Sequence, residues 1–329
     1  SQKSSYYLFF ISQFIQTVVI FYLNLENNIL FFVASLILSF SICFNFINTI
    51  FLTIFQARGL FLKYSYSSVT NSLVFTLLIY PLISIASFIG LALSRLIGII
   101  CMYFTFVRPL KKEDFGLEVK LYNSDFNFPT LILGNFANII IISSRFVSGA
   151  DGSNNITFFM YAVVLLNALL TAVITNISTI LLRKIAGKKN YRLILYSLLV
   201  SIFVGLCMVL ILHFFSTEIV KFIYLRGMFN VSDVEQTAVY LYELSFAFLL
   251  LFVSTILFQP FLSLPIDKNR NNRKYMSLLL LGTIVTGFIF SGFSDLDIQL
   301  ETLIVIYTSS IMGLFLSIYS YYCYSKFTS

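Results

Sequence analysis

Apolar runs of about 18 residues or more recur along the whole chain, separated by short polar segments. As an α-helix, each run is long enough to cross the ~30 Å hydrocarbon core of a bilayer. Helices satisfy their backbone hydrogen bonds internally, so the pattern predicts an all-α polytopic membrane protein with about ten transmembrane helices in two lobes. The predicted spans are about Tyr6–Leu23, Ile29–Phe55, Val69–Ile89, Gly90–Val107, Phe128–Phe146, Ile156–Leu182, Leu193–Phe215, Ala238–Phe261, Tyr275–Phe293 and Thr302–Tyr322.

The third and fourth spans are the hardest to separate, because residues 73–107 hold a single charge, Arg95. One helix of that length would reach about 50 Å, too long to cross a bilayer without a break. Pro81 and Gly90 offer places to turn. The sequence therefore predicts two helices here.

Composition supports the membrane prediction. The chain of 329 residues is 59% hydrophobic and 11% charged, and its mean hydropathy is +0.92, whereas a soluble domain has roughly a quarter charged residues. The four cysteines lie inside apolar runs without C-x-x-C spacing, so we expect neither a disulfide framework nor a zinc site. The net charge of +7 is explained by basic loops and not by a nucleic-acid partner.

The charged residues alternate between the two sides of the predicted topology. Basic loops around Arg58, residues 108–120, residues 183–192 and residues 268–274 fall on one side, and most acidic residues fall on the other. By the positive-inside rule, the basic loops and both termini of this chain are cytoplasmic. The sequence thus predicts a multi-pass protein of the cytoplasmic (inner) membrane.

Two longer polar segments organise the chain. Residues 108–127 are predicted to link an N-terminal lobe of four helices (1–107) to a C-terminal lobe of six (128–329). On the outer side, the sequence predicts a short helix at Glu218–Leu225 and a turn at Arg226–Gly227. The S-x-x-E spacing from Ser232 to Glu235 predicts a capping box, which would start the next helix.

Ionisable side chains inside spans are costly in hydrocarbon and are therefore functional candidates. Arg95 either snorkels to the headgroups or faces a cavity. Arg145 ends a polar stripe that also includes Gly134, Asn135 and Asn138, which favours a cavity-facing position. Glu243 either forms a structural pair with Arg145 or Arg95, or titrates and couples transport to protons.

A second polar stripe lies on the sixth span, at Asn167, Thr171, Thr175 and Ser178. Small hydroxyl residues commonly hold membrane helices together. Together with the Asn135/Asn138/Arg145 stripe, however, they could line a polar path between the lobes. Neither stripe is specific to a substrate.

Enzyme signatures are absent from the sequence. There is no G-x-S-x-G, H-E-x-x-H or P-loop motif, and a single histidine offers little acid–base capacity. We expect no enzymatic activity, no metal and no cofactor.

A family resemblance covers nearly the whole chain and is most specific in the block from residue 218 to residue 263. There, E-I-V-K-F-I-Y-L-R-G-M-F-N from Glu218 to Asn230, followed by Thr237-Ala238, Leu241-Tyr242 and Phe258-Gln-Pro-Phe-Leu-Ser263, resembles the MurJ/MviN family. Asn154–Ala162 resembles the start of that family's eighth helix, and Leu52–Arg108 resembles its fourth to sixth helices. These proteins are lipid II flippases of the multidrug/oligosaccharidyl-lipid/polysaccharide exporter superfamily.

The resemblance implies alternating access between two lobes around a central cavity. It also implies that Ser1 falls near the family's third helix, so that two helices at each end of the family pattern have no counterpart. In the family, an arginine that lines the cavity closely follows a Tyr-Ala pair, whereas Val163 and Val164 follow Tyr161-Ala162 here. As a hypothesis, Arg145 or Arg95 supplies the phosphate partner instead.

Three functions follow as hypotheses. The first is a flippase for a lipid-linked peptidoglycan precursor or oligosaccharide, with the lipid-linked glycan and membrane lipids as partners and an unassigned coupling ion. The second is a polysaccharide or drug exporter of the same superfamily, and the third is a non-transporting membrane scaffold. A polytopic glycosyltransferase is disfavoured because no outer loop is large enough to hold its site.

Overall fold

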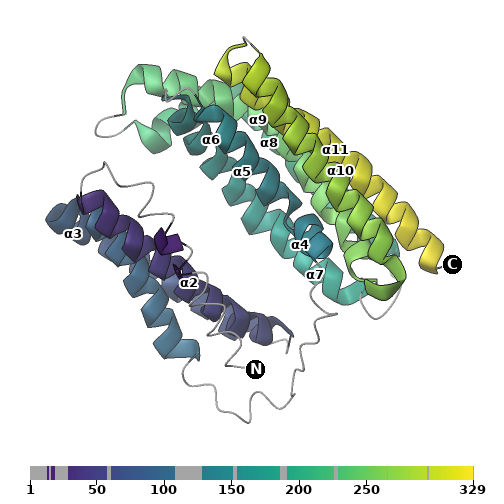
Figure 1. The fold of residues 1–329 in the computed structure, drawn as a ribbon, viewed down its shortest axis with the longest axis horizontal. Helices are drawn as coiled ribbons and strands as arrows, with labels where there is room; N and C mark the ends of the chain where they lie inside the picture. The colour runs from purple at the N-terminus through teal and green to yellow at the C-terminus, as the bar shows by residue number, and fades with distance from the viewer. Residues whose placement is uncertain are drawn as a thin grey trace. The chain divides into compact units, whose positions relative to one another are not determined.

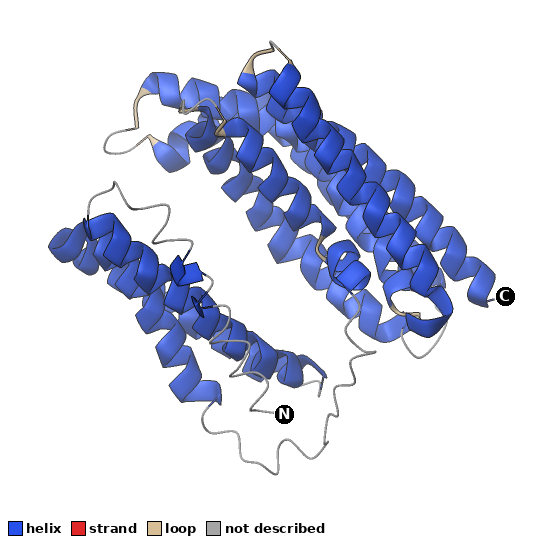
Figure 2. Cartoon of the chain, viewed as in Figure 1, coloured by secondary structure: helices blue, strands red, loops and turns tan. Residues whose placement is uncertain are grey.

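A computed structural model describes residues 13, 14, 16–18, 29–57, 61–107, 128–150, 154–185, 191–225, 229–264, 266–294 and 296–328. Every regular element in these residues is a helix (Figure 2). The chain divides into two compact units, residues 1–123 and 124–329, and the boundary falls within the predicted linker 108–127. That linker lies outside the described residues, as does most of the predicted first span.

The first unit contains α2 (Ile29–Ala57), α3 (Phe61–Met102) and the π-helical η1 (Tyr103–Val107). The segment α3 consists of two helices joined by a turn at Ala86 and Ser87, where Ser87 has φ 49° and ψ −127°. The prediction of two helices is confirmed, with the turn lying between Pro81 and Gly90. The candidate membrane spans on either side are Val69–Ser87 and Ile89–Phe106.

Two glycines let the two halves of α3 approach closely. A Cβ on Gly90 would lie 1.9 Å from the Leu82 carbonyl oxygen, and one on Gly98 would lie 2.9 Å from that of Asn71. The contacts therefore pair residue 90 with 82 and residue 98 with 71, as in an antiparallel hairpin. The second half of α3 also contacts α2, because the buried Asn48 of α2 donates from Nδ2 to the Ile99 carbonyl oxygen at 3.3 Å.

The second unit contains eight α-helices and one π-helical segment among the described residues (Figure 1). They are α4 (Phe128–Gly134), α5 (Phe136–Ser148), α6 (Asn155–Leu169), η4 (Leu170–Thr175), α7 (Asn176–Ile185), α8 (Tyr191–Tyr224), α9 (Val231–Leu262), α10 (Ile266–Phe293) and α11 (Ile298–Thr328).

The core of this unit forms around α9, which packs against α4, α6, α7, α8 and α11. Of its apolar span, 67% is buried, against 22% for α10, so α10 lies at the periphery of this unit. Small residues allow close helix contacts, as expected where lipid offers no hydrophobic drive for packing. For example, a Cβ on Gly205 of α8 would lie 2.3 Å from Leu249 Cδ1 of α9.

The span count differs from the prediction of about ten. Among the described residues, six helices are long and apolar enough to cross a membrane, or seven if the pair α4–α5 forms one span. Two further predicted spans contain only shorter apolar helices, Ile29–Asn45 and Asn155–Ala168. The polytopic all-helical class is confirmed. The first predicted span lies mostly outside the described residues, the fifth is bent between α4 and α5, and the sixth is interrupted by η4.

Three local predictions need correction. The predicted span Phe128–Phe146 is broken at Asn135, where α4 and α5 meet at 77°. The predicted short helix at Glu218–Leu225 is the continuation of α8, which ends at Tyr224. The capping box of α9 is formed by Asn230 and Asp233, because the Asn230 side chain accepts from Asp233 N–H at 3.0 Å and Asp233 accepts from Asn230 N–H at 2.9 Å.

Candidate functional site

Arg145 lies in the last turn of α5 and is exposed. A cation at this end of a helix is stabilised by the partial negative charge of the last carbonyl groups. Asn138, seven residues earlier, is also exposed, and two α-helical turns bring it to nearly the same face. The helix therefore presents an amide and a guanidinium on one face that the rest of its unit leaves uncovered.

A pocket of about 340 Å³ adjoins Arg145 between α5 and α6. Its lining residues are Arg145, Ile156, Thr157, Met160, Tyr161 and Val164. The connection from α5 to α6 is tight, since a Cβ on Gly149 would lie 2.8 Å from the Ile156 side chain. A larger residue at 149 would thus disturb the wall that carries Ile156.

An aromatic cluster stands behind one wall of this pocket. The ring of Tyr161 lies 4.7 Å from that of Tyr224 and 5.2 Å from that of Phe229, centroid to centroid. The Tyr224 hydroxyl also donates to the Tyr161 carbonyl oxygen at 3.2 Å. These contacts connect the end of α8 and the start of the α9 cap to α6, and they fix Tyr161 beside Arg145's pocket.

The lining of the pocket includes one cation, the two hydroxyl-bearing residues Thr157 and Tyr161, and apolar side chains. Arginine binds phosphate or carboxylate through two parallel N–H groups, with a geometry that a lysine cannot reproduce. Val164 lines the same pocket and is exposed, whereas its neighbour Val163 is buried. Arg145 therefore places a guanidinium in the same pocket as Val164. Val164 is one of the two valines that follow Tyr161-Ala162, where the family resemblance implies an arginine.

Glu243 is half-buried on α9, and its carboxylate accepts a hydrogen bond from Gln299 Nε2 of α11 at 2.8 Å. Its backbone carbonyl accepts from the Tyr307 hydroxyl at 2.5 Å. The predicted pairing of Glu243 with Arg145 stays a prediction. Arg95 belongs to the first unit, and its pairing with Glu243 stays a prediction.

The predicted stripe on the sixth span crosses a change of helix type. Asn167 is half-buried near the end of α6, Thr171 and Thr175 belong to η4, and Ser178 is buried in α7. Because π-helical hydrogen bonds join i to i+5, the backbone of this span is not one continuous α-helix. That the four residues line one polar face stays a prediction.

The two remaining candidate residues, Asn135 and Arg95, lie in different units of the chain. Asn135 is exposed at the α4–α5 break, where its side chain donates to the Leu131 carbonyl at 3.1 Å. It therefore does not continue the Asn138/Arg145 face. Arg95 is exposed on the second half of α3, a position compatible with either of its two interpretations.

Sequence reasoning missed two buried ions. Glu301 is 3% exposed in the first turn of α11 and accepts from the hydroxyls of Ser291 at 2.6 Å and Ser294 at 2.5 Å. Arg273 is 1% exposed on α10. Both residues lie at the ends of apolar runs, where the sequence pattern assigns a charged residue to a loop. Nothing in their local sequence distinguishes them from solvated charges.

Comparison with solved structures reveals the architecture. A structure described as the outward-facing conformation of a multidrug resistance MATE family transporter of the MOP superfamily matches with a TM-score of 0.62 and 14% identity, covering 99% of this chain and 78% of that chain. A MATE structure in complex with MaL6 matches with a TM-score of 0.60 and 14% identity, over 98% and 78% of the two chains. No protein-family model and no curated protein sequence matches the chain.

The chain has a MATE-like fold. A third MATE structure, in the straight conformation, agrees with a TM-score of 0.56 at 13% identity, over 98% of this chain and 77% of that chain. All three are described as MATE structures, and one of them as a transporter of the MOP superfamily. At identities this low, the likeness shows the fold of a multi-pass membrane protein alone and does not test the resemblance to the MurJ/MviN family.

Proposed function

We propose that this chain is a flippase that moves a lipid-linked peptidoglycan precursor or oligosaccharide across the cytoplasmic membrane by alternating access. Arg145 and its pocket carry the proposal. The headgroup of such a substrate is an anionic phosphate, which cannot cross hydrocarbon unaided because burying an unpaired charge is very costly. A carrier needs a polar cleft with at least one cation, and Arg145 supplies one beside Thr157.

The MATE-like fold supports this mechanism, since it is a transporter fold built from two units. The pocket walls support the substrate class, because Met160, Tyr161 and Val164 can accommodate an apolar or sugar surface next to the phosphate. Glu243, held by Gln299, is the proposed candidate for ion coupling. Its carboxylate accepts a hydrogen bond from this uncharged amide of α11.

The second candidate is a polysaccharide or drug exporter. It is favoured by the description of one structural neighbour as a multidrug resistance transporter. Arg145 discriminates between substrate charges, because a guanidinium in the pocket attracts anions and repels organic cations. A cationic drug is therefore the less favoured cargo.

Complementation tests the proposal. Cells depleted of their own lipid II flippase would receive the intact gene for this protein, either unchanged or with Arg145→Ala, Arg145→Lys or Arg192→Ala. Hydrogen bonds to charged groups contribute about 1.5–3 kcal/mol, so Arg145→Ala should lower glycan export by on the order of tenfold or more at normal protein abundance. Arg145→Lys should retain part of the activity, because lysine keeps the positive charge but lacks the two parallel N–H groups of the guanidinium.

Arg192→Ala is the matched control, because Arg192 is also an exposed cation of the second unit but lies at the start of α8, away from the pocket. It should complement like the unchanged protein. If the unchanged protein reaches the membrane and supports no export of any lipid-linked glycan, the scaffold hypothesis replaces transport. If Arg145→Ala complements fully, transport stands and the assignment of Arg145 fails.

A further inference from the structure

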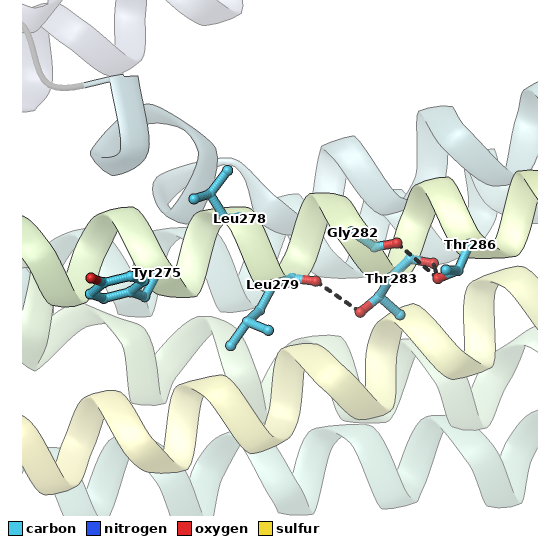
Figure 3. Close-up of a pocket in the computed structure, with 6 residues that line it drawn as sticks. All are labelled: Tyr275, Leu278, Leu279, Gly282, Thr283 and Thr286. Atoms are coloured by element: carbon cyan, nitrogen blue, oxygen red, sulfur yellow. Dashed lines mark hydrogen bonds between the residues drawn. The ribbon is translucent and has the colours of Figure 1, made fainter.

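A shallow groove of about 670 Å³ runs along the exposed face of α10 (Figure 3). Its lining residues are Tyr275, Leu278, Leu279, Gly282, Thr283 and Thr286. Gly282 forms its floor, and a Cβ built there would meet nothing within 4 Å. The large side chains on its edges are strongly exposed: Tyr275 by 64%, Leu278 by 54% and Leu279 by 55%.

Two threonine hydroxyls line the groove, and both bond to the helix backbone. The hydroxyl of Thr283 donates to the Leu279 carbonyl at 2.9 Å, and that of Thr286 donates to the Gly282 carbonyl at 2.8 Å (Figure 3). The helix backbone therefore satisfies both threonine hydroxyls of the groove. An aliphatic chain can lie there without desolvating a polar group.

Two basic residues continue the rows of the groove toward the N-terminal end of α10. Residues four apart on an α-helix are surface neighbours, and a row of them winds gradually around the helix. Two such rows flank the groove, one with Arg270, Lys274, Leu278, Gly282 and Thr286, and the other with Asn271, Tyr275, Leu279 and Thr283. Arg270, Asn271 and Lys274 are all exposed. The irregular backbone at Asn269 precedes both rows, so regular helix carries them throughout.

The dimensions match one leaflet of a bilayer. From Tyr275 to Thr286 the helix rises about 17 Å at 1.5 Å per residue. Half of a ~30 Å hydrocarbon core is about 15 Å. Arg270 and Lys274 would then stand at headgroup level, with Tyr275 at the interface where tyrosines are enriched.

We propose that this face of α10 binds an anionic glycerophospholipid of the leaflet at the N-terminal end of the helix. The lipid phosphate lies against Arg270 and Lys274, and one acyl chain fills the groove over Gly282. This site is separate from the Arg145 pocket and does not depend on the proposed transport function. It is a regulatory or stabilising lipid site and not a substrate path.

Native mass spectrometry of the purified protein in detergent tests the proposal, with phosphatidylglycerol and phosphatidylcholine as probes. Each basic residue near a membrane surface contributes about 1 kcal/mol toward anionic lipid, so the double variant Arg270→Gln/Lys274→Gln should bind phosphatidylglycerol on the order of tenfold more weakly. Removing the same charge at the exposed Lys184 and Arg192 should leave binding unchanged.

A second pair of variants tests the groove itself. Gly282→Leu fills it with a side chain and should weaken phosphatidylglycerol binding several-fold. Gly292→Leu is its control, because a Cβ there also meets nothing within 4 Å but the residue lies outside the groove. Both changes replace glycine by a better helix former, so neither should prevent folding.

Three outcomes would overturn the proposal. One is equal retention of phosphatidylglycerol by the Gly282→Leu and Gly292→Leu variants. Another is a dimer that Gly282→Leu abolishes, which would assign the groove to a second copy of the chain. The third is displacement of phosphatidylglycerol by an equal concentration of polyprenyl phosphate, which would assign the groove to a transport substrate.

Discussion

Arg273 is a buried cation held by a helix end. Its Nη2 donates to the carbonyl oxygens of Leu264 at 2.7 Å and Phe261 at 3.2 Å, and its Nη1 donates to Thr130 Oγ1 at 2.8 Å. Its guanidinium carbon also lies 5.4 Å from the centre of the Phe261 ring. The last carbonyls of α9 lack intrahelical partners, so this side chain both caps α9 and joins it to α4 and α10.

We predict that Arg273→Met lowers the stability of the protein by about 2–4 kcal/mol, because several buried carbonyl groups lose their donors at once. The melting temperature in detergent should fall by several degrees. Arg192→Met is the control, since Arg192 is an exposed arginine at the start of α8 and such surface changes stay within about 0.5 kcal/mol. Equal melting temperatures for the two variants would show that Arg273 is not a cap.

Glu301 shows how a carboxylate can be buried without a cation. The hydroxyls of Ser291 and Ser294 donate to its two oxygens, and its place in the first turn of α11 adds the favourable end of the helix dipole. The three residues connect α10 to α11 across their short loop. Removing either hydroxyl takes a hydrogen bond from a buried carboxylate, which is costly.

Ser291→Ala and Ser294→Ala should each lower the free energy of unfolding by about 1–3 kcal/mol. Because both hydroxyls bind one carboxylate, the loss in the double variant should differ from the sum of the two single losses. Melting of the four proteins of this cycle in detergent measures the coupling. Ser277→Ala is the control, since the buried Ser277 donates only to the Lys274 carbonyl of its own helix. Additive losses that match Ser277→Ala would contradict a shared carboxylate.

At the scale of elements, glycine decides where helices can meet. The two halves of α3 touch through their backbones at Gly90, which lies three residues after the positive φ of Ser87. A φ of 49° favours glycine over serine, so the turn is held by packing around it and not by local preference. A side chain at position 90 would separate the helices.

Gly90→Ala should therefore reduce folding markedly, because a Cβ at 1.9 Å from a carbonyl oxygen cannot be accommodated by rotating a side chain. We expect a large loss of membrane-inserted protein, measured as abundance after extraction in mild detergent and as melting temperature of what remains. Gly292→Ala, in open space on α10, should be neutral or slightly stabilising. Normal abundance of the Gly90→Ala protein would show that the hairpin is looser than described.

The sequence predicted elements better than the joints between them. Apolar length located α2, α8, α9, α10 and α11, because hydropathy is a sum over many residues. It missed the 77° break at Asn135 and the π-helical turn of η4, because each depends on how neighbouring helices satisfy a few freed backbone groups. The capping box was displaced from Ser232 to Asn230, since both residues belong to the N-cap class.

The candidate site was predicted only in part, for the same reason. A cation inside an apolar run identified Arg145, and the structure gives it a pocket. The partner of Glu243 could not be found from sequence, because Gln299 is uncharged and 56 positions away. Arg273 and Glu301 were missed because burial at a helix end depends on tertiary packing.

At the scale of the whole molecule, the charge pattern predicts an orientation that can be measured directly. Asn230 caps the start of α9 and Asn271 follows its end, and both are exposed. About 48 Å of helix separates the ends of α9 at 1.5 Å per residue, enough to cross the bilayer once. Because Arg270 and Lys274 surround Asn271, the positive-inside rule places it in the cytoplasm and Asn230 outside.

Single cysteines would test this orientation in a background without the four native cysteines, Cys43, Cys101, Cys207 and Cys323. A membrane-impermeant maleimide should label Asn230→Cys in intact cells and Asn271→Cys only after the membrane is opened. Gly152 and Gly187, which lie outside the described residues, give a second pair with the same expectation on the outer and cytoplasmic sides. Labelling of both Asn230→Cys and Asn271→Cys in intact cells would mean that α9 does not span the membrane. Labelling of Asn271→Cys alone would show that the orientation is opposite to the predicted one. The lipid proposed to bind α10 would then come from the outer leaflet, because that site is defined by the N-terminal end of the helix and not by a side of the cell.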